Sequence, residues 1–255
     1  MIVVDETCCI CGNLSTFEIM EGAACFREAK CSSCGARLRN SDLARVLIDE
    51  IAYPSSSLKD CFHTFKEMRI LEAQASGPIH EAFKQLPGYV CFEYFDGVKP
   101  GEFVDGILCN DLEHLTFDDN SFDMIITQDV MEHVINPDKA FAEISRVLKK
   151  NGRHIFTIPF HEGRSTIFRS ELPQIHHGDP LRSSGALVNI DWGDDIGAFI
   201  DKHGMKTTSV IAHRFYRPEE ITNVDQSYEE YLTTERIKYF RYNSIVFVSE
   251  KVEPE

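Results

Sequence analysis

The chain lacks the long apolar stretches that a membrane protein needs. None of the apolar runs in its 255 residues approaches the roughly 18 residues of a membrane-spanning helix. The N-terminus, MIVVDETCC, has neither the basic region nor the apolar stretch of a secretory signal peptide. We therefore expect a cytoplasmic protein without a membrane span.

Positive charge is also scarce. The net charge is −15, from 26 lysines and arginines against 41 acidic residues. This balance argues against the broad electropositive face that sequence-independent nucleic-acid binding uses. A cluster at Arg27, Lys30, Arg37 and Arg39 leaves a local basic patch open, although acidic residues lie among these side chains. The length suits one α/β domain of about 200 residues and a small accessory module.

Cysteine, in contrast, is abundant, and its spacing is informative. Cys8-x-x-Cys11 and Cys31-x-x-Cys34 are separated by 19 residues, and a glycine follows each pair. Structural zinc sites use such paired knuckles, so the spacing predicts one tetrahedral Zn²⁺ held by four thiolates in a zinc ribbon. Two unrelated thiol pairs or a redox motif are the alternative. A site with four thiolates is coordinatively closed, which favours a structural or docking role.

The composition predicts a boundary after this ribbon. Ser41 is expected to cap a helix with one apolar face, and Pro54 with the serines after it marks a break. The predicted organisation is a zinc ribbon at 1–40, a connecting helix and linker at 41–57, and a larger domain at 58–255.

The run from Asn120 to Pro159 predicts a strand, a turn, a helix and a second strand in unbroken order. Its first apolar stretch, Phe122–Thr127, suits a strand buried on both faces, and the apolar residues that follow recur at helical spacing. Asn151-Gly152 is expected to stop that helix, and Arg153–Ile158 supplies the next strand. The segment therefore reads as one βαβ crossover, whose carboxyl edge is where ligands gather in open α/β sheets.

The same residues, NSFDMIITQDVMEHVINPDKAFAEISRVLKKNG, resemble the fourth and fifth strands of class I S-adenosylmethionine (SAM) dependent methyltransferases, in the type 11 group. The hallmark of that group reads SFD, then D-V-x-E-H-V, then R-V-L-K-x-G-G, and Asn151-Gly152 stands where it has two glycines. The resemblance implies a Rossmann-like α/β fold with seven strands, the last antiparallel, and SAM as the cofactor.

The resemblance also implies where SAM would bind. Glu72 to Gly77 takes the place of the glycine-rich turn, but Ala73 and Ala75 stand at two of the glycine positions. Glu93 falls 21 residues after Glu72, close to the interval of about 20 residues that brings a carboxylate to ribose in dinucleotide folds. By resemblance, Glu93 would hold the ribose hydroxyls.

The other cofactor-binding residues follow from the same resemblance. Tyr94 and Asp111-Leu112 are expected on the adenine side, and Gln128 beside the amino-acid part of SAM. Only seven residues, from Asp96 to Glu102, connect the second and third predicted strands. They are too few for a helical crossover, so we expect that helix to be missing or vestigial.

The candidate catalytic residues follow the fourth and fifth strands. Asp129, His133, His161 and His176 could align an acceptor or remove its proton, since the imidazole pKa lies near about 6.5. Asp129, Glu132 and His133 also resemble the E-x-x-E-H trio that binds a divalent cation in ubiquinone-pathway O-methyltransferases, and oxygen ligands suit Mg²⁺. In many relatives the Glu-His pair instead caps the helix and packs the turn.

A long polar stretch at 160–192 is expected to form a lid over the acceptor, with a surface excursion as the alternative. Arg164, Arg169 and Arg182 within it would suit an anionic acceptor. The leading prediction is methyl transfer from SAM to a small-molecule or glycan acceptor, at oxygen. The alternatives are an RNA methyltransferase that docks its substrate through the ribbon, and a non-catalytic SAM-fold protein that binds partners through the ribbon.

Overall fold

The computed structural model describes residues 3–18, 25–179, 182–215 and 242–252. The chain forms two compact units, which are described separately below. The first unit comprises Met1–Met68, Ser76–Tyr89 and Ser209–Val246, and the second comprises Arg69–Ala75, Val90–Thr208 and Phe247–Glu255.

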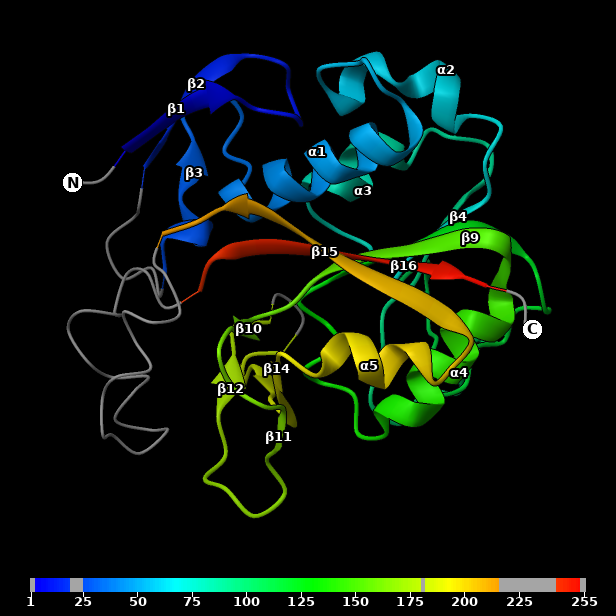
Figure 1. The fold of residues 1–255 in the computed structure, drawn as a ribbon. Coiled ribbons are helices and arrows are strands. Elements are labelled where there is room, and N and C mark those ends of the chain that lie inside the picture. The colour runs from blue at the N-terminus through cyan, green and yellow to red at the C-terminus, as the bar shows by residue number, and fades with distance from the viewer. Residues whose placement is uncertain (1–2, 19–24, 180–181, 216–241, 253–255) are drawn as a thin grey trace. The chain divides into compact units, whose positions relative to one another are not determined.

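The first unit begins with a small antiparallel sheet in the order β1-β2-β3 (Figure 1). Its strands are β1 (Val3–Thr7), β2 (Leu14–Glu18) and β3 (Lys30–Cys31), and the short 3₁₀ helix η1 (Phe26–Glu28) precedes β3. Phe17 and Phe26 are fully buried beneath this sheet, in one cluster with Cys8 and Cys31. The cysteine knuckles therefore belong to the small core of the ribbon.

The helix after the ribbon is α1 (Leu38–Ile51). The prediction that Ser41 caps it is wrong, because Arg37 is the N-cap residue and its backbone N–H donates to Asn40 Oδ1 at 3.2 Å. Ser41 lies one turn inside the helix, where its Oγ accepts from the backbone N–H of Cys9 at 2.9 Å. The hydroxyl thus ties the first knuckle to α1 instead of capping it.

Three short helical segments complete the described part of the first unit. They are η2 (Leu58–Asp60), α2 (Phe62–Phe65) and α3 (Pro78–Phe83). Pro78 occupies the first helical position of α3, as expected, since its fixed φ suits that position. Phe65 and Phe83 pack with ring centroids 4.9 Å apart, which joins α2 to α3.

The largest sheet has six strands in the order β15-β16-β9-β8-β4-β5. Its central strands β4, β8 and β9 are parallel, and Ile70 to Glu72 pair with Met124 to Ile126. The expected third strand is reduced to a single parallel bridge between Glu93 and Cys109, so six strands stand where seven were expected. The strands are β4 (Ile70–Glu72), β5 (Tyr89–Cys91), β8 (Phe122–Gln128), β9 (Leu148–Thr157), β15 (Met205–His213) and β16 (Ser244–Lys251).

The βαβ crossover is confirmed, with one shifted boundary. Helix α4 (Pro137–Val147) begins at Asn136, whose side chain accepts from the backbone N–H of Lys139 at 3.1 Å. It ends at Val147, so the prediction that Asn151-Gly152 stops it is wrong. Asn151 instead takes a positive φ of 59° inside β9, where the strand register shifts.

The connection between the second and third expected strands contains no helix in residues 92–110, all of which the structure describes. A hairpin of β6 (Phe103–Val104) and β7 (Ile107–Leu108) takes its place, as the short spacing predicted. The described residues of the stretch at 160–192 form short strands joined by loops and turns, and helix α5 (Ile196–Asp201) follows. The strands are β10 (Phe160–His161), β11 (Ile167–Phe168), β12 (His176–His177), β13 (Ala186–Leu187) and β14 (Ile190–Gly193).

Helices α4 and α5 are neighbours in the second unit (Figure 1). Aromatic side chains make the contact between them. The ring of Phe141 on α4 lies 6.0 Å from Phe199 on α5 and 5.9 Å from the buried Trp192. Trp192 Nε1 donates to the carbonyl of Met131 at 3.0 Å, so its polar edge is satisfied. None of the helices in the described residues is long and apolar enough to cross a bilayer.

A buried charge cluster stabilises the first unit. His213 Nδ1 lies 3.0 Å from Asp42 Oδ2, and its Nε2 lies 3.2 Å from Glu6 Oε2. Asp42 is fully buried. Burial alone would lower the pKa of His213, but the hydrogen bonds to Asp42 and Glu6 outweigh it and raise that pKa to about 10. The imidazolium is therefore the form that the folded chain stabilises.

We expect His213→Gln to lower the free energy of unfolding by about 3 kcal/mol near pH 6, because it leaves the Asp42 carboxylate buried without its cation. The folded pKa lies above the ordinary value of 6.5, so this stabilisation is complete below about pH 6.5 and fades as the pH rises toward 10. Urea unfolding across this range measures it. His203→Gln, which breaks a pair with the exposed Asp138, is the matched control. A pH-independent difference would contradict the assignment.

Candidate functional site

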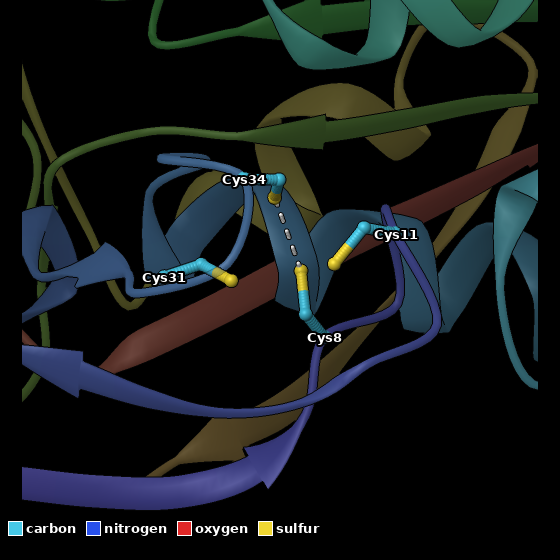
Figure 2. Close-up of side chains that lie close together, drawn as sticks. All are labelled: Cys8, Cys11, Cys31 and Cys34. Atoms are coloured by element: carbon cyan, nitrogen blue, oxygen red, sulfur yellow. Dashed lines mark hydrogen bonds between the residues drawn. The ribbon is translucent and has the colours of Figure 1, made fainter.

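Four cysteine thiols face one another in the first unit (Figure 2). The Sγ atoms of Cys8, Cys11, Cys31 and Cys34 all lie within 4.8 Å of one another, and those of Cys8 and Cys34 are 3.8 Å apart. A tetrahedral site with Zn–S bonds of about 2.3 Å has sulfur–sulfur edges of about 3.8 Å. The four predicted ligands therefore come together at a spacing that fits Zn²⁺.

A glycine turn shapes each knuckle. The backbone N–H groups of Gly12 and Gly35 donate to the carbonyls of Cys8 and Cys31, both at 2.8 Å. The two glycines have φ values of 79° and 76°, a conformation that L side chains rarely adopt. Each pair of cysteines is thus held in the same tight turn.

The protonation of the thiols also favours a cation. Burial raises the pKa of Cys8 far above its usual range and that of Cys34 to about 11. Burial opposes ionisation of Cys31 as well, but hydrogen bonds from the Ser15 side chain and nearby backbone amides lower its pKa to about 7. A thiolate is the zinc ligand, so a bound dication would supply the charge that the other thiols need in order to ionise.

The carboxyl ends of β4 and β8 bring Glu72 and Gln128 together in the second unit. Glu72 is fully buried, and its Oε1 accepts from Gln128 Nε2 at 2.6 Å. The backbone N–H of Ala73 then donates to the carbonyl of Ile126 at 3.1 Å, which continues the parallel pairing into the turn. Two of the predicted cofactor residues are therefore direct neighbours at one edge of the sheet.

The turn after β4 explains why most of its expected glycines can be absent. Ala73, Ala75 and Ser76 all have negative φ, whereas Gly77 has a φ of 94°. Glycine is therefore kept at the one position of this turn where a side chain would be strained. The backbone path does not require glycine at the other positions.

Glu93 connects the three segments that were expected to bind SAM. Its Oε1 accepts from the backbone N–H of Ala75 at 2.8 Å, in the turn after β4. Its carbonyl accepts from the N–H of Asn110 at 3.0 Å, at the start of the third segment. Burial raises the pKa of Glu93, and the nearby Asp179 carboxylate acts in the same direction.

The predicted adenine side lies just after this carboxylate. Tyr94 is 47% exposed, and Leu112 is buried. Asp111 Oδ1 accepts from the backbone N–H of Glu113 at 2.8 Å, which orders the turn that carries Leu112. A hairpin stands in place of the expected crossover helix here, and the Tyr94 ring next to Glu93 stays accessible.

The predicted catalytic residues do not form one cluster. Asp129 takes a positive φ of 52° directly after β8, and His133 follows one turn later. His161 is only 3% exposed and faces Asp191, with 3.7 Å between Nε2 and Oδ1. His176 is exposed on β12.

The structure instead gathers Glu132, His133 and His177, whose ligand atoms lie within 4.8 Å of one another. His177 was not among the residues predicted for this group. His177 lies in the polar stretch at 160–192. It meets the turn after β8 only when the chain is folded. The adjacent His176-His177 pair was the available signal, but spacing alone could not tell which of the two turns inward.

The stretch at 160–192 also reaches the predicted adenine side. Arg182 donates through Nη2 to the carbonyl of Tyr94 at 2.7 Å, and its guanidinium carbon lies 5.7 Å from the Tyr94 ring centroid. The same side chain pairs with Asp179 and Asp96. Arg169, in contrast, forms a buried ion pair with Asp191, so its charge is already compensated.

Comparison with known proteins agrees with this arrangement. Residues 95–156 match the family described as methyltransferase domain, a segment that includes β8, α4 and most of β9. This segment is similar to part of a methyltransferase domain. The Rossmann-like sheet of the chain has the switch in strand order, between β4 and β8, at which α/β folds bind ligands. The match covers most of the crossover and includes Asp111-Leu112, and it ends before the stretch at 160–192.

A curated relative matches a short part of the chain. This relative, an uncharacterized protein of Methanocaldococcus jannaschii, is 43% identical over 51 residues, which are 20% of this chain and 22% of that protein. The chain thus aligns with about a fifth of the length of this relative.

Several solved structures are similar over most of the chain. The YcgJ protein of Bacillus subtilis is 16% identical, with 77% of this chain and 98% of that chain covered and a TM-score of 0.43. A SAM-dependent methyltransferase from Methanosarcina mazei is 13% identical, with 73% and 93% covered and a TM-score of 0.40. The [4+2]-cyclase SpnF is 16% identical, with 88% and 85% covered and a TM-score of 0.44.

We expect Arg182→Ala to speed amide hydrogen exchange in residues 176–187 and 94–96 by about fivefold, the effect of losing about 1 kcal/mol of local stability. Arg182 is the side chain that joins these two segments, so both should respond together. Exchange followed by mass spectrometry measures the change, with Lys99→Ala as a control in the exposed loop nearby. Faster exchange in only one segment would show that Arg182 does not connect them.

Proposed function

We propose that this protein is a SAM-dependent methyltransferase that transfers a methyl group to the oxygen of a small-molecule or glycan acceptor. The observation that carries the proposal is the meeting of three segments at Glu93: the turn after β4, the end of β5 and the residues after Cys109. A half-buried carboxylate held by a backbone N–H at the carboxyl edge of a parallel sheet suits the hydroxyls of a ribose.

The cofactor would supply a methyl group that is already activated by its sulfonium. We assign the ribose to Glu93, the turn beside the methionine part to Glu72 through Gly77, and the adenine side to Tyr94 and Asp111-Leu112. Glu93 uses Oε1 for Ala75, and its second oxygen accepts no hydrogen bond from the residues that the structure describes. That oxygen is the one proposed to receive a ribose hydroxyl. Gln128 would position the amino-acid part while its amide donates a hydrogen bond to the buried Glu72.

The acceptor side is assigned to the residues after β8 and β9. Asp129 and His133 lie closest in sequence to the cofactor edge, and we propose that they orient the acceptor oxygen and that the Asp129 carboxylate receives its proton. His161 and His176 are retained as further candidates, although His161 is buried against Asp191. The strongly negative net charge favours a small acceptor over RNA.

We also propose that Cys8, Cys11, Cys31 and Cys34 bind one structural Zn²⁺. The support is the convergence of four thiols from two glycine turns, at the sulfur spacing of a tetrahedral ion. The ion would help to hold together a sheet of three short strands. A closed site of this kind would leave the ribbon surface free to contact a substrate or a protein partner.

We expect S-adenosylhomocysteine to bind with micromolar affinity in calorimetric titration, and Glu93→Gln to weaken it on the order of tenfold, the loss of a charge-assisted hydrogen bond. Glutamine can still accept from Ala75, so the variant tests the charge with the turn preserved. Glu102→Ala, an exposed glutamate of the same unit, is the control. Equal binding by both variants would remove Glu93 from the site. Absence of binding by the wild-type protein would favour the non-catalytic alternative.

We expect Cys34→Ser to lower the zinc content of the purified protein by one equivalent per chain and to lower its melting temperature, since zinc contributes to folding of the ribbon. Cys34 is the most exposed of the four ligands, so its replacement disturbs the packing least. Elemental analysis measures the zinc. Cys91→Ser, a half-buried thiol outside the cluster, should leave the content unchanged. Equal zinc in both variants would refute the assignment.

A further inference from the structure

Glu132 carries a buried charge in the second unit that no hydrogen bond from the described residues compensates. Its residue is 1% exposed, and neither carboxylate oxygen accepts a hydrogen bond from any residue that the structure describes. A buried carboxylate without hydrogen bonds is costly, so such groups are normally paired or bound to a metal. Glu132 therefore needs a positively charged partner.

Two histidines face this carboxylate. His133 Nε2 lies 3.6 Å from Glu132 Oε1, and His177 Nδ1 lies 3.4 Å from the same oxygen. Both distances exceed the usual limit of about 3.2 Å for a hydrogen bond. They match the separation of two ligands around one ion, because metal–ligand bonds of about 2.1 Å at a tetrahedral angle place ligand atoms about 3.4 Å apart.

The second nitrogen of His133 is already used. Its Nδ1 donates to the carbonyl of Leu187 at 2.7 Å, which leaves Nε2 with its lone pair directed to the Glu132 side. Metal-binding histidines commonly donate their other ring N–H to a carbonyl in this way, which fixes the tautomer and the ring orientation. The imidazole is therefore oriented as a ligand.

Hydrogen bonds hold the backbone around the cluster. The carbonyl of Glu132 accepts from the N–H groups of Asn189 and Ile190 at 2.8 and 3.1 Å. Asn189 Nδ2 donates to the carbonyl of His133 at 2.7 Å. Leu187, which orients His133, belongs to the hairpin of β12 and β13 that carries His177. The hairpin thus supplies His177 and orients the His133 ring, and the residues directly after it bind the Glu132 backbone.

We propose that Glu132, His133 and His177 form a second metal site, which binds a divalent transition metal such as Zn²⁺, Fe²⁺ or Co²⁺. Two imidazoles and one carboxylate favour such ions over Mg²⁺, which prefers oxygen ligands. The set differs from the expected Asp129, Glu132 and His133, because His177 takes the third place. Three protein ligands leave coordination positions open for an oxygen-bearing ligand. The site does not depend on SAM binding.

Titration with Co²⁺ tests the proposal on protein that carries zinc in its cysteine cluster and has been stripped of weakly held metal. Cobalt at the proposed site should give visible d–d absorption without the thiolate charge-transfer bands that cobalt among the cysteines would produce. We expect His177→Gln to weaken this binding on the order of 100-fold or more, at least the upper end of the range for losing a residue that only supports a ligand. His176→Gln, the adjacent exposed residue of the same strand, should bind like the wild type.

Equal cobalt binding by the wild type and His177→Gln would overturn the site, as would cobalt spectra with thiolate bands alone. His177 is partly exposed, so its replacement should leave the fold intact, and circular dichroism checks this. Glu132→Gln is the second variant and should lose cobalt to the same extent. Displacement of the cobalt by an equal concentration of Mg²⁺ would overturn the assignment to nitrogen-rich coordination.

Discussion

The parallel pairing of β4 with β8 and of β8 with β9 is the constraint on which the second unit depends. Parallel strands present their carboxyl ends at one edge of the sheet, so the residues that follow Glu72, Gln128 and Thr157 lie beside one another. The N–H of Asp129 donates to the carbonyl of Thr157 at 2.9 Å, and that of Ala73 donates to Ile126. The pairing thus continues into both turns and fixes where the polar side chains begin.

Compensation of buried charge organises the rest of the molecule. Glu72 accepts a hydrogen bond from the amide of Gln128, and Arg169 neutralises Asp191. In the first unit, Asp42 is neutralised by His213. Removing one member of such a pair is more costly than the pair is worth, because the other charge stays buried. Glu132 departs from this pattern, and it does so where two imidazoles converge on it.

The two irregular connections have opposite effects on the edge of the sheet. The short connection after β5 replaces a helix with the β6–β7 hairpin, which leaves Tyr94 exposed. The long connection after β9 returns over this region, and Arg182 binds the carbonyl and the ring of Tyr94. Tyr94 thus lacks the cover of the expected helix, but it is contacted by a segment that is distant in sequence. The stretch at 160–192, which was expected to cover the acceptor, therefore also contacts the side chain that was expected beside the adenine.

Local sequence was sufficient to predict the features that depend on short spacing. The cysteine knuckles, the βαβ crossover and the missing helix follow from distances of a few residues along the chain, which limit the backbone to few conformations. Helix ends were less predictable, because Ser41 and Asn151-Gly152 satisfy capping rules that tertiary contacts override. The glycine-poor turn also depends on φ values that residue identity does not report.

The tertiary structure alone decided which polar residues meet across long separations. His177 joins Glu132 and His133, and His213 joins Asp42, because strand pairing and hairpin packing bring their segments together. No periodicity in the sequence encodes those contacts. Spacing along the chain therefore determined the local elements and the cysteine pairs, whereas burial and strand register determined the charge pairs, the contact of Arg182 with Tyr94 and the meeting of Glu132, His133 and His177.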